Sequence, residues 1–544
     1  MRGKRFAANA IVWLMAAMMC FAAPKAFAQD QQEQGQKKTP YTLAEYNAYQ
    51  AAQGQTDPQA RIQALDDFVN KFPNSALMPL VYQLYYTTYN QMKNYPKVIE
   101  YTDKYMAVPD DKILLIPGTS KEKLTGDRLQ ALYFRAVAFN QSFNASDPNA
   151  TEELTKARQS ALDGLKLLDE IPKPANMTDE QFAQQKKQPA VLFNYTAASA
   201  AFQLKDYNAA IASYKAELAA SGNPTDQNAA IVYYHMGIAY LTLASQQPKP
   251  QGQTASPPPN GTPPATPPAT GSTAAPATST APQPGTDLYM DGFWNLARSV
   301  ALKGPGEAQM RSYLRAQMFN YEQPACGNLL DDQMNELIQL AGTQADRPAT
   351  YSIPSAADLA KVLQGSNLLS ILSDLQGGGD KAKMTWLAVC GQEIPNVYGK
   401  IIDMTPGTDS IDFKVFTAAT GQEIQAGTTA NLDVMVYTSA PAAGATPATG
   451  ANAGQTQSQT PPPVQPEAAR LKKGDPIKFT GTLVKYDTQP FLLYFDKCQV
   501  DPSVIPAATK APARRPRHPG RGRGLGFAMD QQSLTIAGIQ RGSF

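Results

Sequence analysis

Four tyrosines near the start of the chain fall on one face of a helix, and this spacing constrains the fold more than any other feature. They occupy positions i, i+3, i+4 and i+7, and they are Tyr82, Tyr85, Tyr86 and Tyr89. The turn sequence Asn94-Tyr95-Pro96 ends that helix, and the same period then continues from Val98 to Val108. We therefore expect two antiparallel helices joined by a short turn.

The helical pattern returns further along the chain. From about Leu43 to Ala244 the sequence predicts successive helices with few strand signals. Two later stretches, near Ala197 and Tyr233, start about 36–39 residues apart, close to the period of a known helix-pair repeat. Small residues such as Gly237 suit helices that cross closely, because a larger side chain would hold the backbones apart.

Two stretches carry a family resemblance. Residues 205–211 (KDYNAAI) and 233–240 (YYHMGIAY) resemble tetratricopeptide repeats of the exported bacterial type, and residues 71–75 (KFPNS) are similar to the turn between repeats in exported members. The resemblance implies a mainly α chain, with an α-solenoid of antiparallel helix pairs over residues 43–245 and 287–345. An irregular all-α domain of another type is the alternative.

Tandem helix pairs of this kind stack so that a concave groove receives a protein partner. The tyrosine face is too wide an arc to be entirely core, so we expect some of its rings to line that groove. The candidate binding residues are Tyr82, Tyr86, Tyr89, Tyr233 and His235. The alternative is that these side chains only fill the core between helices.

Residues 246–286 have a different composition. They contain twelve Pro, one charged residue (Lys249) and no aromatic side chain. Such a segment cannot bury enough apolar area to offset chain entropy, so the sequence predicts disorder. Helical periodicity resumes near Asp287, which predicts an insertion between two helices of one repeat. Residues 228–245 and 287–303 should then pack against each other.

The period changes after Pro354. Following a short helical piece, Gly377-Gly378-Gly379 introduces alternating apolar and polar residues, which predict strands of a small antiparallel barrel over residues 354–505. Gly399 and Gly481 are the predicted positions of bends in these strands. Residues 438–465 read as a second disordered insertion. The run 474–483 (GDPIKFTGTL) resembles the late strand of an OB-fold barrel, and an SH3-like barrel is the alternative.

The first residues match a secretory signal peptide. Arg2, Lys4 and Arg5 precede an apolar run and then the small-residue site Ala26-Phe27-Ala28. We expect residues 1–28 to be removed after Ala28, residues 29–42 to be disordered, and the mature chain to lie in a periplasmic or extracellular space. A lipid anchor at Cys20 is the alternative. No transmembrane segment is expected in the mature chain, because the apolar run is shorter than the ~20 residues of a membrane span.

Three cysteines remain after this cleavage, and an oxidising compartment favours their pairing. They are Cys326, Cys390 and Cys498, and the sequence does not decide between one disulfide and buried free thiols. No Cys/His spacing suits zinc, so no metal or cofactor is expected. His235 and His518 are the only histidines, and no catalytic set with a known spacing is present. The chain is therefore expected not to be an enzyme.

The charge balance is nearly neutral, with 48 Lys and Arg against 46 Asp and Glu, which argues against a globally basic nucleic-acid binder. The basic charge gathers in the predicted disordered tail, residues 506–544. Such a tail binds polyanions by counterion release, and its candidate residues are Arg514, Arg515, Arg517, Arg521 and Arg523.

Three functions remain open. The first is a non-catalytic envelope scaffold that binds another envelope or secreted protein through its repeats. The second is a polyanion binder, of glycan, nucleic acid or another anionic surface, that uses the barrel and the basic tail. The third is an envelope enzyme accessory or hydrolase with activity in the barrel.

Overall fold

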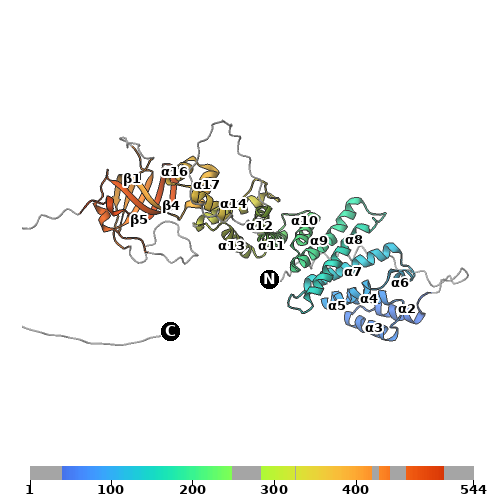
Figure 1. Cartoon of the computed structure of the whole chain (residues 1–544). Helices are drawn as coiled ribbons and strands as arrows, with labels where there is room; N and C mark the ends of the chain where they lie inside the picture. The colour runs from blue at the N-terminus through green and yellow to red at the C-terminus, as the bar shows by residue number, and fades with distance from the viewer. Residues whose placement is uncertain (1–38, 248–283, 325, 419–427, 441–460, 508–544) are drawn as a thin grey trace, which may run out of the picture. The chain divides into compact units, whose positions relative to one another are not determined.

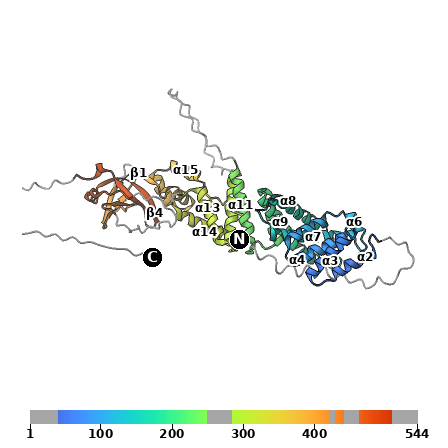
Figure 2. The same cartoon turned by 90° about the horizontal axis from the view of Figure 1, so that it is seen from below.

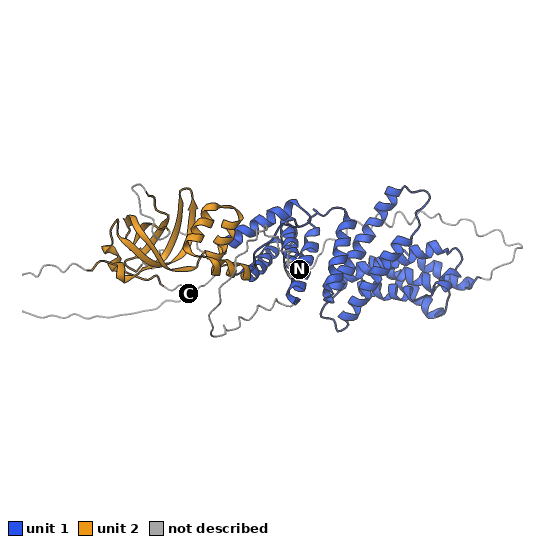
Figure 3. Cartoon of the chain, turned by 45° about the horizontal axis from the view of Figure 1, so that its top comes forward, with its two compact units in different colours: residues 1–323, 329–355 blue, residues 324–328, 356–544 orange. Residues whose placement is uncertain are grey.

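The computed structural model describes residues 39–247, 284–324, 326–418, 428–440 and 461–507 (Figure 1). The chain forms two compact units (Figure 3). The helical unit contains residues 1–323 and 329–355, and the barrel unit contains residues 324–328 and 356–544. The predicted signal peptide, most of the Pro-rich segment and the basic tail lie outside the described residues.

The helical unit is a succession of helices in which most neighbours along the chain pack against each other. Their bounds are α2 Leu43–Gln53, α3 Pro58–Lys71, α4 Met78–Gln91, α5 Tyr95–Met106, α6 Asp110–Leu114, α7 Lys121–Ser142, α8 Ala150–Glu170, α9 Asp179–Gln203, α10 Tyr207–Ser221, α11 Ala229–Gln246, α12 Pro284–Ala301, α13 Glu307–Glu322 and α14 Gly327–Thr343. The start of α14 belongs to the barrel unit. None of the described helices is long and apolar enough to cross a membrane.

Side chains at the helix starts satisfy backbone donors that lack a partner within the helix. Thr42 and Thr178 form capping boxes with Glu45 and Gln181, and the side chain of Asp206 accepts a hydrogen bond from the backbone of Ala209. Asn94 caps α5 in the same way, directly before Pro96. The predicted break between α4 and α5 is therefore confirmed.

Helices α11 and α12 pack side by side although residues 248–283 separate them in sequence (Figure 1). Their contact depends on two glycines. A Cβ on Gly237 would lie 2.6 Å from Cγ of Leu296, and a Cβ on Gly292 would lie 2.6 Å from Cγ of Leu241. The predicted packing across the insertion is confirmed. Its bounds differ by a few residues, because α11 runs on to Gln246 and α12 begins at Pro284.

Three short helices precede the strands of the barrel unit, and they are α15 Ala356–Gly365, α16 Leu368–Gly377 and α17 Gly379–Val389. The expectation that strands begin after the three glycines is wrong. Gly378 and Gly379 have φ of 69° and 67°, a conformation that suits glycine and separates α16 from α17. The sheet starts only at Glu393.

Five strands close into a barrel in the order β1-β2-β3-β5-β4. Their bounds are β1 Glu393–Pro406, β2 Ser410–Phe416, β3 Leu432–Tyr437, β4 Pro476–Thr488 and β5 Phe491–Val500. Neighbouring strands are antiparallel except β3 and β5, which are parallel. β1 and β4 lie side by side at the closure of the barrel (Figure 2).

Apolar side chains fill the barrel interior, because every second side chain of a strand points inward. Phe413, Phe479 and Phe495 are at most 2% exposed. Both predicted glycine positions lie where a neighbour approaches closely. A Cβ on Gly399 would lie 2.9 Å from the carbonyl oxygen of Phe416, and one on Gly481 would lie 2.6 Å from Sγ of Cys498.

The second predicted insertion is shorter than expected, because residues 461–465 belong to the folded unit. Gln465 is buried, donates from Nε2 to the carbonyl of Val500 at 2.8 Å and accepts from the amide of Val500 at 2.6 Å. A 3₁₀ turn, Pro466–Arg470, follows directly. Residues 441–460 lie outside the described residues.

The structure also decides between the cysteine alternatives. Cys326 and Cys390 form a disulfide, which joins the segment between α13 and α14 to the end of α17. Cys498 is a buried free thiol on β5. Burial raises the pKa of Cys498 well above its usual range, so it is a core residue rather than a reactive thiol.

Candidate functional site

A group of aromatic rings in mutual contact lies between α4 and α5, and we call it the tyrosine cluster. Its members are Tyr82, Tyr85, Tyr89 and Tyr101. The ring of Tyr101 is 4.1 Å from that of Tyr85, 5.6 Å from that of Tyr89 and 6.2 Å from that of Tyr82. Tyr85 is buried, whereas the other three are partly exposed. The helical spacing of α4 places three of the rings on one face, and α5 supplies the fourth.

Charged groups border the tyrosine cluster. Glu100 pairs with Lys97 at 2.7 Å and with Lys104 at 2.6 Å, and Nζ of Lys104 lies 4.5 Å from the ring centre of Tyr101. The hydroxyl of Tyr85 donates to Asp66 at 2.6 Å. This border combines both signs of charge with aromatic faces, which suits a polypeptide better than a polyanion.

The hydroxyls of Tyr85, Tyr89 and Tyr101 remain protonated at physiological pH. Burial, with the nearby Tyr89, raises the pKa of Tyr101 to about 12. Burial also raises the pKa of Tyr89, and burial with the bond to Asp66 raises that of Tyr85 far above its usual value. These three residues therefore offer apolar rings and hydrogen-bond donors rather than phenolate anions.

The predicted binding residues divide between surface and core. Tyr82 and Tyr89 are partly exposed members of the tyrosine cluster. Tyr86 and Tyr233 are 0% and 5% exposed, so their proposed role in a groove is not supported by their placement. Tyr86 packs on Phe134 of α7, with ring centres 5.5 Å apart.

His235 of α11 packs against side chains of α9 and α10, outside the tyrosine cluster. Its Nδ1 lies 2.9 Å from the hydroxyl of Tyr214, and Phe202 stacks on its ring at 5.1 Å. Burial lowers the pKa of His235 to about 4, so the ring is neutral near pH 7. No carboxylate among the described residues forms a hydrogen bond with this ring, and its placement favours a packing role.

Two buried acids were not singled out from the sequence. Glu217 on α10 is 7% exposed, and its Oε2 has no hydrogen-bond partner within the described structure. Glu322 on α13 is fully buried beside the side-chain amide of Gln333, whose nitrogen lies 2.8 Å from one carboxyl oxygen once the amide is oriented to donate. Burial raises both pKa values to about 8. Glu322 lies four residues after the buried Met318 on α13, and this helical spacing is the one sequence signal that indicates its burial.

A charged row crosses the outer surface of the barrel, made by Lys414, Asp433, Tyr494 and Lys485 on four adjacent strands. Lys414 pairs with Asp433, and Lys485 pairs with Asp487 at 2.9 Å. Both ammonium groups are thus already neutralised, so the charged row offers no unpaired cation to a polyanion. The tail arginines, Arg514 to Arg523, lie outside the described residues.

Within the described part of the chain, no group of three His, Cys, Asp or Glu side chains is placed to hold a metal ion. In comparisons with known proteins, no family model matches the chain and no curated protein sequence matches it significantly.

Proposed function

We propose that this chain is an exported, non-catalytic scaffold whose helical unit binds another envelope or secreted protein. The observation that carries the proposal is the tyrosine cluster. The partly exposed rings of Tyr89 and Tyr101 stack on each other, and the ring of Tyr82 packs at a tilt against Tyr101, so these rings are held in place before a partner arrives. Rigid tyrosine side chains supply large contact area at low entropic cost, and they are enriched among the residues that dominate binding energy.

The architecture supports the same proposal. We propose that the helical unit is of the tetratricopeptide type, on the residues of the α9–α10 turn and of α11 quoted above. We further propose that the barrel is of the OB type, because β1 hydrogen-bonds both β2 and β4 and because β3 runs parallel to β5. Proteins built from such modules commonly bind other molecules through exposed surfaces.

Export is part of the proposal. The Cys326–Cys390 disulfide supports it, because disulfides persist in oxidising compartments and are rare in reducing ones. The signal-peptide pattern of residues 1–28 supports it independently. A fusion of residues 1–40 to a reporter that is active only outside the cytoplasm tests this step, and an inactive fusion would contradict it.

Site-specific photo-crosslinking tests the partner-binding step. A photoreactive phenylalanine analogue is placed at Tyr89, and at Leu162 of α8 as the control, since Leu162 is 42% exposed and lies outside the tyrosine cluster. We expect one defined protein adduct from position 89 in native envelopes and none from position 162. Identical adducts at both positions, or none at position 89, would contradict the proposal.

Polyanion binding by the basic tail stays a prediction. It requires salt-dependent binding to heparin that truncation after Thr509 removes. Heparin binding that survives this truncation would assign the activity elsewhere in the chain.

A further inference from the structure

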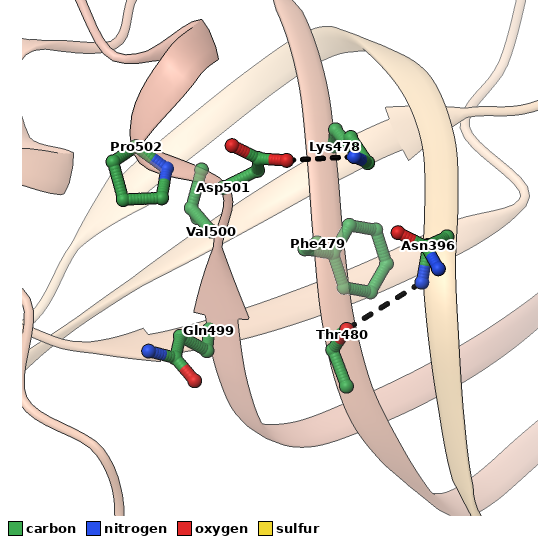
Figure 4. A pocket seen from close by; sticks show the side chains of 8 residues that line it. All are labelled: Asn396, Lys478, Phe479, Thr480, Gln499, Val500, Asp501 and Pro502. Carbon is green, nitrogen blue, oxygen red and sulfur yellow. Dashed lines mark hydrogen bonds and ion pairs between the residues drawn. The ribbon is translucent and has the colours of Figure 1, made fainter.

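A cavity opens on the outside of the barrel where β1, β4 and the end of β5 meet, and the proposed function does not use it (Figure 4). Its volume is about 160 Å³. A cavity of ~150 Å³ can hold one benzene-sized ring. Its polar groups come from Asn396, Lys478, Thr480, Gln499 and Asp501.

A β-bulge presents one of these groups. The register of β1 against β4 shifts between Ile394 and Val397, and Asn396 within that step has a φ of 54°. The left-handed region is one that asparagine tolerates better than most residues, and bulges commonly redirect a side chain. The backbone N–H of Asn396 donates to Oγ1 of Thr480 at 3.4 Å (Figure 4). The bulge therefore holds the Asn396 amide at the cavity.

Two neutral amides have their hydrogen-bonding capacity available. The side chains of Asn396 and Gln499 make no hydrogen bond to any residue that the structure describes, and both are exposed. Each amide can donate two hydrogen bonds and accept two. Figure 4 shows them on opposite sides of the strand that carries Lys478 and Thr480.

The charges at the cavity cancel. Nζ of Lys478 lies 2.7 Å from Oδ2 of Asp501 (Figure 4). The cation that lines the cavity is thus paired, which removes the main attraction for a phosphate or a sulfate. The lining groups suit a neutral ligand with several hydroxyls.

An exposed aromatic ring stands beside this cavity. Tyr398 on β1 is 61% exposed, and its ring centre lies 5.5 Å from Nζ of Lys478. Lys478 and Tyr398 are direct partners in the β1–β4 register. An aromatic face next to amide groups matches a sugar ring, which has an apolar face of C–H groups and an edge of hydroxyls. We propose that this cavity and the ring of Tyr398 bind a neutral oligosaccharide.

Titration calorimetry on the full chain tests this site. The probes are cellohexaose, chitohexaose and maltohexaose, with single-stranded oligothymidylate as the competing ligand class. We expect one of the three oligosaccharides to bind, and Tyr398→Ala to weaken that binding about tenfold or more, equivalent to about 1.4 kcal/mol. Tyr46→Ala is the matched control, because Tyr46 is an exposed tyrosine (40%) of the helical unit, and it should leave the affinity unchanged.

A second variant keeps the test decisive if Tyr398→Ala fails to fold. Asn396→Gly removes one amide at a position whose φ suits glycine, so it should preserve the fold and still weaken binding. The proposal is overturned if none of the three oligosaccharides binds, or if neither variant changes the affinity. It is also overturned if only oligothymidylate binds, since the site would then recognise nucleic acid.

Discussion

Glu217 and Glu322 are buried carboxylic acids of the helical unit, and burial raises the pKa of each to about 8. In the unfolded chain these groups ionise near pH 4–5. Their contribution to stability is therefore fully present below about pH 4.5, and it is lost as the pH rises through 8. The helical unit should become less stable between these values.

Glu217→Gln tests this dependence at one residue. The amide is nearly isosteric with the neutral acid but cannot ionise, so the variant should lose less stability than the wild type between pH 5 and pH 9. We expect a difference on the order of 3 kcal/mol in the free energy of unfolding across that interval. Urea titrations followed by circular dichroism measure it. The exposed Glu170→Gln is the control, and equal pH dependence in both variants would refute the assignment.

At individual residues, periodicity predicts only part of the candidate site. The spacing of the tyrosines correctly placed them on a helix, and correctly indicated that they could not all be core. It could not say which were exposed, because that depends on neighbours distant in sequence. Tyr86 is covered by Phe134 of α7, whereas Tyr82 and Tyr89 pack against Tyr101 of α5 and stay partly exposed.

At the scale of elements, the α11–α12 contact should be sensitive to one methyl group. Gly237→Ala places a Cβ within 2.6 Å of Leu296 and 3.0 Å of the carbonyl oxygen of Gly292. Overpacking of this kind costs about 1–3 kcal/mol. Gly126→Ala in α7 is the control, because no atom lies within 4 Å of its added Cβ, and helix propensity should make it neutral or slightly stabilising. A melting temperature for Gly237→Ala at or above that of Gly126→Ala would contradict this packing.

The disulfide makes a second element-scale prediction. Cys326 and Cys390 are 64 residues apart, and the chain-entropy relation gives about 4 kcal/mol for a loop of that length. Cys326→Ser/Cys390→Ser should lower the melting temperature of the barrel unit, measured by calorimetry. Reductant should lower the wild-type melting temperature in the same way and leave the double variant unchanged. A wild type insensitive to reductant would argue against the bridge.

The type of an element, helix or strand, was predictable where the apolar periodicity extended over many residues. The prediction was wrong at the glycine run, because glycine is compatible with more than one kind of structure. Gly377-Gly378-Gly379 predicts the start of the strand region, yet α17 begins at Gly379. Ala382, Trp386 and Val389 follow at helical spacing and are buried, so the signal was present but short. Residues 461–465 were missed for another reason, because the bonds of Gln465 to Val500 connect positions far apart in sequence.

At the scale of the whole molecule, the helical unit continues on both sides of residues 248–283, where α11 packs against α12. Replacing residues 248–283 with about six Gly/Ser residues should preserve the fold. Shortening the loop that far should add about 1.5 kcal/mol by the loop-closure relation, with a small rise in melting temperature. A protease cut within this segment should leave the two pieces together on a sizing column. Two pieces that separate as folded bodies would contradict a single helical unit.

The partner's dissociation constant is the measurement that tests the central claim most directly. The protein crosslinked through position 89 is purified and titrated against the wild type, Tyr82→Ala/Tyr89→Ala and the control Tyr46→Ala, with circular dichroism confirming that each chain is folded. We predict that the double variant weakens binding by about a hundredfold, or about 2.7 kcal/mol, and that the control binds as the wild type does. Equal affinity of the folded double variant and the wild type would show that the tyrosine cluster does not bind the partner.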